Sequence, residues 1–201
     1  NNNELNRITS NTRPKRIIIA KNQDTIESIL KNDHEIQNIL LRNSSFTYKG
    51  VCYSVVFKSL INKRIPNKNW GQVYAVGRIN NQVPIVKYNK KGFISFNLPG
   101  GGTESGESYE ETLRRELLEE LNMRVLDFEP IGYQINVAPN GKKYYQLRVF
   151  ANLEKVGDFK KDVGGSVIGY ELEIIQTLND RINWGEVGDW FTLILQDKYE
   201  E

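Results

Sequence analysis

Alternation of apolar and polar residues dominates the chain after Trp70 and predicts a series of strands. An Asn80-Asn81 pair and a polar turn closing at Gly92 separate the first segments. We expect these segments to form a meander leading directly into Gly100, Gly101 and Gly102. The expected strands are residues 72–79, 82–88 and 93–96.

The pattern continues after residue 122 with a second predicted hairpin. Residues 123–138 and 143–153 flank Pro139-Asn140-Gly141, a typical turn sequence. Four glycines and a Lys160-Lys161 pair indicate a mobile loop over residues 156–169. A strand over 170–178 and a closing helix over 189–199, with Trp190, Ile194 and Leu195 facing inward, complete the predicted elements.

The apolar and polar pattern of the first 65 residues predicts a separate group of elements. We expect a strand over 16–20, one or two helices over 24–41 and a strand or hairpin over 48–60. A polar, basic stretch over 61–70, interrupted by Pro66, indicates a boundary. The sequence therefore predicts a small N-terminal α+β extension (1–65) and a main domain (66–201).

A helix that carries several carboxylates is expected just after Glu107. Ser108 and Glu111 have the spacing of a capping box, which places the helix N-terminus there. At about 100° per residue, three carboxylates fall on one face, bordering an apolar stripe. The carboxylates are Glu116, Glu119 and Glu120, and the stripe is Leu113, Leu117 and Leu121.

The composition indicates in which cellular compartment the protein acts. Its apolar runs are far shorter than the roughly 20 residues that span a bilayer, and no signal peptide is visible. One cysteine, Cys52, cannot form an internal disulfide, and one histidine, His34, cannot build a His-rich metal site. We expect a cytoplasmic protein that does not act on membranes, with His34 on a surface helix and Cys52 buried in a strand.

Charge is unevenly distributed along the chain. Residues 1–100 hold 16 Lys/Arg and 5 Asp/Glu, whereas residues 101–201 hold 11 and 20. Ordinary solvated surface explains this asymmetry. The alternative is a polyanionic ligand held between basic side chains and metal-loaded carboxylates.

The glycines and the carboxylates together suggest a metal site. Glycines at 100–102, after Pro99, allow the main chain to approach a metal or phosphate closely. Clustered carboxylates raise one another's pKa unless cations compensate. Mg²⁺ suits such ligands because it prefers oxygen and retains water molecules that can act as nucleophiles.

The segment from Gly101 to Met123 resembles the signature of Nudix hydrolases. That signature is Gly, five residues, Glu, seven residues, Arg-Glu-aliphatic, one residue, Glu-Glu, one residue, Gly, aliphatic. One position departs, because Asn122 replaces the usual glycine, and Asn is the next most tolerant residue in a left-handed conformation. The matching residues are Gly101, Glu107, Arg115, Glu116, Leu117, Glu119, Glu120 and Met123.

The resemblance implies an α/β/α sandwich around a mixed central sheet and dependence on Mg²⁺ or Mn²⁺. It also implies attack by water on a diphosphate bridge linked to another moiety. Carried over by position, the metal ligands would be Glu116, Glu119 and Glu120, with the Gly100 carbonyl nearby and Glu107 as a further candidate. Arg115 would orient the carboxylates through an ion pair.

The general base and the substrate contacts stay open. The general base would be Glu116 or Glu120, or else a carboxylate outside the signature. The outside candidates are Glu171, Glu173 and Glu186. For these three, the alternative is a role as solvated surface residues. Arg78 and Arg148 could bind phosphate or lie on the surface. Four aromatic residues could stack on a base or pack in the core: Tyr88, Phe96, Tyr133 and Tyr145.

Spacing beyond the signature bears on the substrate. In this family, a proline 15 to 16 residues after the signature is associated with ADP-ribose-type substrates, and Pro139 follows Met123 by 16 residues. A plain hairpin turn would also explain a proline at this position. Related sugar-nucleotide hydrolases often dimerise through an extra N-terminal β element, which raises a homodimer as an expectation. The favoured function is hydrolysis of a nucleotide sugar. The alternatives are an NTP, a dinucleoside polyphosphate or an RNA 5′ end as substrate, or a non-catalytic nucleotide sensor.

Overall fold

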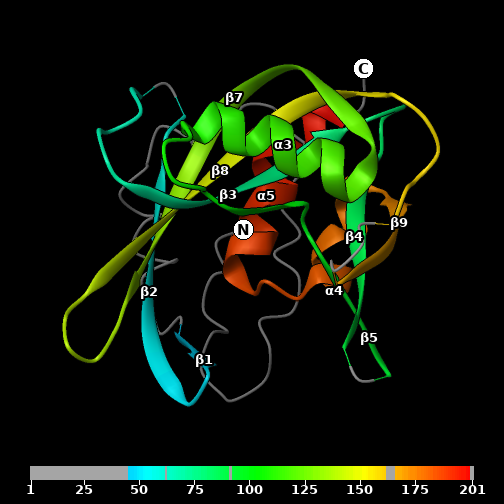
Figure 1. Cartoon of the computed structure of the whole chain (residues 1–201). Coiled ribbons are helices and arrows are strands. Elements are labelled where there is room, and N and C mark those ends of the chain that lie inside the picture. Colours follow the sequence, from blue (N-terminus) through cyan, green and yellow to red (C-terminus); the bar gives the residue numbers. More distant parts are fainter. Residues whose placement is uncertain (1–44, 62, 91, 162–165, 200–201) are drawn as a thin grey trace, which may run out of the picture.

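The computed structural model describes residues 45–61, 63–90, 92–161 and 166–199 (Figure 1). The strand expected at 16–20, the helices expected over 24–41 and His34 lie outside them. The described strands are β1 (Ser45–Tyr48), β2 (Val51–Ser59), β3 (Trp70–Arg78), β4 (Val83–Lys90), β5 (Phe93–Asn97), β6 (Gly100–Gly102), β7 (Met123–Val137), β8 (Lys143–Lys155) and β9 (Val167–Glu173). The helices are α3 (Tyr109–Leu121), α4 (Leu178–Ile182) and α5 (Glu186–Leu195), with 3-10 turns at Ile175–Thr177 and Gln196–Tyr199.

The described strands form two sheets. The larger has the order β1-β2-β7-β8-β3-β6, and the smaller has the order β5-β4-β9. Strands β3 and β8 run parallel, whereas every other neighbouring pair is antiparallel. The larger sheet is therefore mixed, as expected.

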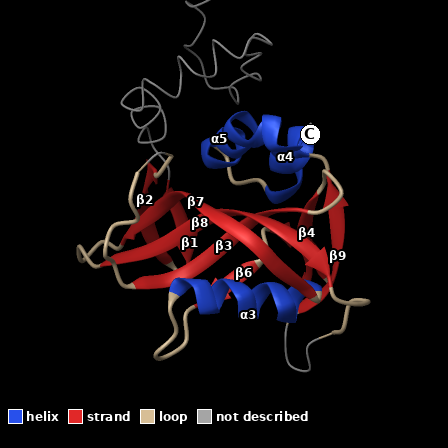
Figure 2. Ribbon diagram, turned by 90° about the horizontal axis from the view of Figure 1, so that it is seen from above, coloured by secondary structure: helices blue, strands red, loops and turns tan. Residues whose placement is uncertain are grey.

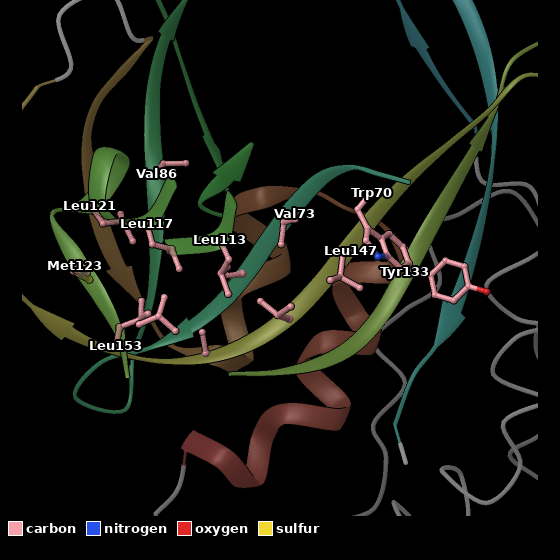
Figure 3. Packing of buried hydrophobic residues seen from close by; sticks show 14 of the residues in the cluster. Trp70, Val73, Val86, Leu113, Leu117, Leu121, Met123, Tyr133, Leu147 and Leu153 are labelled. Atoms are coloured by element: carbon pink, nitrogen blue, oxygen red, sulfur yellow. The ribbon is translucent and has the colours of Figure 1, made fainter. Parts of the chain in front are cut away.

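Helices cover the strands on two sides (Figure 2). Helix α3 buries Leu113, Leu117 and Leu121 against strand residues such as Val73 and Leu147 (Figure 3). On the other side, Trp190 and Phe191 of α5 pack against Phe57, Val76 and Phe150. The predicted α/β/α sandwich is confirmed.

The predicted meander is wrong at its first turn. Asn80 and Asn81 form the expected turn with positive φ angles of 48° and 57°, but only an isolated bridge, Ile79 to Gln82, continues the pairing. Strand β3 pairs with β8 on one side and β6 on the other. Because both its edges are occupied, β4 diverges and pairs with β5 and β9.

The C-terminal third contains more helix than the pattern suggested. The strand expected over 170–178 occupies residues 167–173 instead, so it takes in the end of the expected loop. A 3-10 turn and α4 follow, because Leu178 and Ile182, four residues apart, are both buried. Helix α5 begins three residues before the predicted start and buries Trp190 and Leu195, with Ile194 packed against the core.

The strand or hairpin expected over 48–60 is observed as one strand, β2, which forms a hairpin with the earlier strand β1 through Lys49 and Gly50. The expectation of a buried Cys52 is wrong, since it is exposed in the outer part of β2, before pairing with β7 begins at Ser54. Strand β2 is a member of the large sheet and buries Phe57. The boundary at residue 65 stays a prediction. Within the described part of the chain, every helix is too short or too polar to cross a bilayer.

Candidate active site

The N-terminus of α3 is fixed by side-chain caps. The Ser108 hydroxyl accepts a hydrogen bond from the Glu111 amide, and the Glu111 carboxylate accepts one from the Ser108 amide, so the predicted capping box is present. Just before it, Glu107 accepts hydrogen bonds from the Glu104 amide and the Thr112 hydroxyl. The loop leading into α3 is therefore held at two adjacent points.

The glycines bring the main chain against the helix. Gly100 has φ of 135°, and a Cβ there would lie 2.2 Å from the Val73 carbonyl oxygen. A Cβ on Gly101 would lie 2.4 Å from Glu116 Oε1, whereas one on Gly102 would meet nothing within 4 Å. Only glycine therefore permits the approach of β6 to both β3 and the Glu116 carboxylate.

Arg115 lies at the centre of the acidic side chains. Its guanidinium donates to Glu107 at 2.7 Å, to Glu116 at 2.9 Å and to Glu119 at 3.2 Å. A further N–H bonds the Gly102 carbonyl at 2.8 Å. One planar cation thus ties the glycine turn to three carboxylates, the ion pairing expected for this residue.

These contacts set opposite pKa shifts in neighbouring carboxylates. The bonds from Arg115, followed by the Glu104 amide, lower the pKa of Glu107 to about 2. Burial raises the pKa of Glu116, although Arg115 opposes that shift. Bonding to Glu107 chiefly raises the pKa of Arg115, which stays charged.

Glu120 occupies the most enclosed position of the carboxylates. It accepts hydrogen bonds from the Gly100 amide at 2.8 Å and from the Tyr88 hydroxyl at 3.0 Å. Burial raises its pKa to about 7; the two bonds lower it, and the charges of Glu116 and Glu119 raise it again. Of the predicted aromatic contacts, Tyr88 is therefore the one held against a signature carboxylate.

The carboxylates have the right chemistry for a divalent cation. Among the described residues, no three acidic, His or Cys side chains converge to hold an ion without rearrangement, because Arg115 lies between Glu107, Glu116 and Glu119. The donors nevertheless fit Mg²⁺: they are all oxygen, and burial, followed by the charges of Glu116 and Glu119, raises the pKa of Glu120. A bound cation would remove that repulsion.

Asn122 ends α3 as the sequence suggested. It has φ of 53° and ψ of 45°, the left-handed conformation, and its amide bonds the Leu117 and Leu118 carbonyls. Its side chain donates to the Asp158 carbonyl at 2.8 Å. The departure from the family pattern therefore leaves the helix end intact.

Arg148 is buried rather than on the surface, and its role in binding phosphate stays a prediction. Its exposed fraction is 2%, and its guanidinium lies between the rings of Tyr74 and Trp184, at 4.8 and 4.5 Å from their centroids. It donates to Gln134 and Gln146, and burial lowers its pKa to about 10. A surface role for Arg148 is wrong, because β8 turns this side chain inward beside Tyr74, which pairs with Gly100.

Four of the other predicted substrate contacts have partners outside the signature. Arg78 bonds Asn152 and the Lys198 carbonyl, and Pro139 is exposed at the tip of the β7–β8 hairpin, which points away from α3 in Figure 1. Phe96 lies under Arg181, 4.2 Å from the ring centroid. Tyr133 and Tyr145 pack around Trp70.

The outside carboxylates are held by cations. Glu171 pairs with Lys87 and Arg181, and Glu173 pairs with Arg181; Arg181 and then Lys87 lower the pKa of Glu171. Glu186 is the first residue of α5. Among the interactions of the described residues, neither Glu171 nor Glu173 contacts a signature carboxylate.

Sequence reasoning missed the polar row that surrounds Arg148. Gln146 donates to Gln72, Arg148 donates to Gln146 and Gln134, and Gln134 donates to Asn136. A signal was present, since polar residues alternate within otherwise apolar strands at 134, 136, 146 and 148. Tyr74 and Trp184, which enclose the guanidinium, gave no such signal.

Comparison with known proteins agrees with this geometry. The family model described as NUDIX domain matches residues 69–186. No curated protein matches the chain in sequence. A crystal structure of the Bacillus subtilis pyrophosphohydrolase BsRppH is 19% identical with a TM-score of 0.53, covering 79% of this chain and 96% of that one. A crystal structure of an ADP compounds hydrolase is 16% identical with a TM-score of 0.50, covering 78% and 90%; both likenesses concern the fold.

Proposed function

Since the chain belongs to the Nudix family of hydrolases, we propose that it is a metal-dependent pyrophosphohydrolase of a nucleoside diphosphate derivative. The observation that carries this proposal is the junction of the glycine turn with α3. There, Arg115 bonds Gly102 and three carboxylates, and Gly100 bonds Glu120. A structural helix would have no need of partly buried carboxylates that repel one another.

Each residue of this junction has a proposed role. Glu116, Glu119 and Glu120 would hold Mg²⁺ or Mn²⁺, with the Gly100 carbonyl and Glu107 as further ligands. When bound, the cation supplies charge neutralisation for the diphosphate and activates water. Glu116 or Glu120 would accept a proton from the attacking water, and Arg115 would keep the carboxylates in position.

The favoured substrate is ADP-ribose or another nucleotide sugar. Support comes from the spacing of Pro139 within the family pattern and from Arg148, a buried cation one strand away from the glycine turn. The positive charge of this guanidinium would favour a nearby anionic group. Hydrolysis would release a nucleoside monophosphate.

We place the enzyme in the cytoplasm, in keeping with a single free cysteine. A homodimer is proposed on family grounds.

The test replaces single oxygen donors in the carboxylates. Glu119→Gln and Glu120→Gln should each reduce turnover of ADP-ribose with Mg²⁺ by about 10²-fold or more, measured by release of AMP. Exposed Glu110, on the same helix and paired only with Arg114, offers the matched control Glu110→Gln, which should retain activity. Full activity in both signature variants would refute the metal-site assignment.

A substrate panel separates the alternatives. Sugar nucleotides, NTPs, dinucleoside polyphosphates and 5′-triphosphorylated RNA are each incubated with Mg²⁺ or Mn²⁺. Preference for one class identifies the leaving group. Tight nucleotide binding by calorimetry, with no product after long incubation with metal, would instead favour a non-catalytic sensor.

A further inference from the structure

One end of the large sheet carries a row of aromatic residues on a single face. Phe46 lies opposite Tyr53, Val55 lies opposite Asn136, and Asn136 lies opposite Tyr144. Because side chains two residues apart on a strand share a face, Tyr48 and Tyr53 lie on that face as well. We call residues 45–54 and 136–144 the aromatic arm.

These rings are open to solvent and already arranged for stacking. The exposed fractions of Tyr48, Tyr144 and Phe46 are 57%, 41% and 39%. The rings of Phe46 and Tyr53 are stacked, with centroids 5.2 Å apart and an interplanar angle of 12°, and Tyr144 meets Tyr53 edge-on at 6.0 Å. Exposed aromatic residues in a row are uncommon on a soluble surface and mark a binding face.

The charge of the arm has one sign. No Asp or Glu occurs between residues 45 and 103 or between residues 130 and 153. Lys49 and Lys142 lie over the rings of Tyr48 and Tyr144, at 5.4 and 5.0 Å from the centroids. Two ammonium groups therefore lie beside the exposed rings of the arm.

We propose that the aromatic arm binds single-stranded RNA. Proteins that bind single strands combine a basic surface for the phosphates with aromatic rings for unpaired bases, and RNA presents unpaired bases more often than DNA does. A dimer contact made through the arm itself would bring two cationic surfaces together, which like-charge repulsion opposes, so the proposed homodimer would leave the arm free. An anionic bilayer would bind the lysines, but its lipids contain no flat bases that could stack on the parallel rings of Phe46 and Tyr53.

This interaction does not depend on the proposed hydrolysis. The arm contains none of the carboxylates of α3, and its ligand needs neither a metal nor a diphosphate. Binding is therefore tested with an oligouridylate of about 12 nucleotides that has a 5′-hydroxyl and a fluorescent label, in EDTA. Fluorescence anisotropy then reports on the arm whether or not the signature residues are catalytic.

Two sets of variants separate charge from stacking. The double variant Lys49→Glu/Lys142→Glu should weaken binding at least 10-fold. It should also reduce the slope of log affinity against log salt concentration by roughly 1.4, because each phosphate contact on a single strand contributes about 0.7. The matched control Lys160→Glu/Lys161→Glu, an equal charge change on an exposed loop, should change the affinity less than about 3-fold. Tyr48→Ala and Tyr144→Ala should each weaken binding about 10-fold, whereas Tyr48→Phe and Tyr144→Phe should stay near wild type.

Several results would overturn the proposal. Equal affinity in the arm variants and the loop control would show that any binding is non-specific. Preference for a DNA strand over the RNA probe, or binding only to vesicles of anionic phospholipid, would assign the arm another partner. Failure to bind the probe, with a dimer in light scattering that Tyr48→Ala dissociates, would make the arm a self-association surface. Unchanged circular dichroism in each variant confirms that the fold is retained.

Discussion

At the scale of single residues, Arg115 explains how four acidic side chains coexist in and just before α3. Its guanidinium bonds Glu107, Glu116 and Glu119, so their mutual repulsion is partly offset. Glu120 has no such cation among the described contacts and relies on two neutral donors, the Gly100 amide and the Tyr88 hydroxyl. The signature therefore contains two electrostatic environments within five residues.

Gly101→Ala tests whether the close approach of the turn matters. The added Cβ would lie 2.4 Å from Glu116 Oε1, so the carboxylate must move away from its bond with Arg115. We expect turnover to fall at least 10-fold, since displacement of a ligand by about 1 Å can cost that much or more. Gly102→Ala, where the Cβ meets nothing within 4 Å, should keep most activity. Equal turnover in the two variants would contradict this role for Gly101.

Glu120 makes a prediction about stability and pH in the metal-free protein. Its pKa is about 7 in the folded protein and 4.5 as the ordinary value, so the folded state retains the proton to higher pH. The free energy of unfolding should therefore fall as pH rises from about 4.5 to 7 and level off above that. The shift corresponds to at most about 3 kcal/mol.

Urea titrations in EDTA at pH 4.5, 6 and 8 measure this effect. The difference in unfolding free energy between wild type and Glu120→Gln should change with pH, because the amide does not titrate. Parallel curves for the two proteins would contradict the shifted pKa. Addition of Mg²⁺ at pH 8 should stabilise wild type more than the variant if Glu120 is a ligand.

At the scale of elements, α3 is a capped helix whose two ends serve different purposes. The capping box at Ser108 fixes the N-terminal end, directly after Glu107, and the left-handed Asn122 turns the chain into β7. Leu113, Leu117 and Leu121 anchor the helix to the sheet between these ends. The carboxylate face is therefore positioned by interactions made elsewhere on the helix.

Asn122→Ala and Asn122→Gly separate backbone conformation from side-chain bonding. Alanine pays the left-handed penalty of about 1–2 kcal/mol and loses the bond to the Asp158 carbonyl. Glycine loses only the bond, so its unfolding free energy should stay within about 0.5–1 kcal/mol of wild type. Thermal and urea unfolding measure both, and equal losses would show that the bond, not the conformation, matters.

At the scale of the whole molecule, the N-terminal region contributes to the main core. Strand β2 pairs with β7 over residues 54–59, and Phe57, 1% exposed, contacts Trp190 and Phe191 of α5 edge-on. A Cβ on Gly132 would lie 2.3 Å from the Phe57 ring. Segments from both ends of the chain thus pack around one aromatic cluster.

Phe57→Ala should therefore destabilise the entire fold. The loss of a buried phenyl ring costs about 3–5 kcal/mol, measured by urea unfolding followed through tryptophan fluorescence. Val51→Ala, on the outer, partly exposed end of the same strand, should change the unfolding free energy by less than about 1 kcal/mol. A small effect of Phe57→Ala would indicate that residues before 65 fold as a separate unit.

Local sequence determined the elements whose signals lie within a few residues. The helix caps of α3, the Asn80-Asn81 turn, the β7–β8 hairpin and the carboxylate face follow from spacing, because each depends on contacts between near neighbours in the chain. The family and the reaction type also follow from one 23-residue segment, Gly101 to Met123.

Tertiary structure alone decided how distant segments meet. The separation of β4 from β3, the inward turn of Arg148 between Tyr74 and Trp184, the pairing of Glu171 with Arg181 and the exposure of Cys52 depend on which strands are neighbours. Strand pairing joins residues far apart in sequence, and the alternation within one strand does not specify its partner. For that reason the sequence identified the carboxylates of the site but not the side chains that surround them.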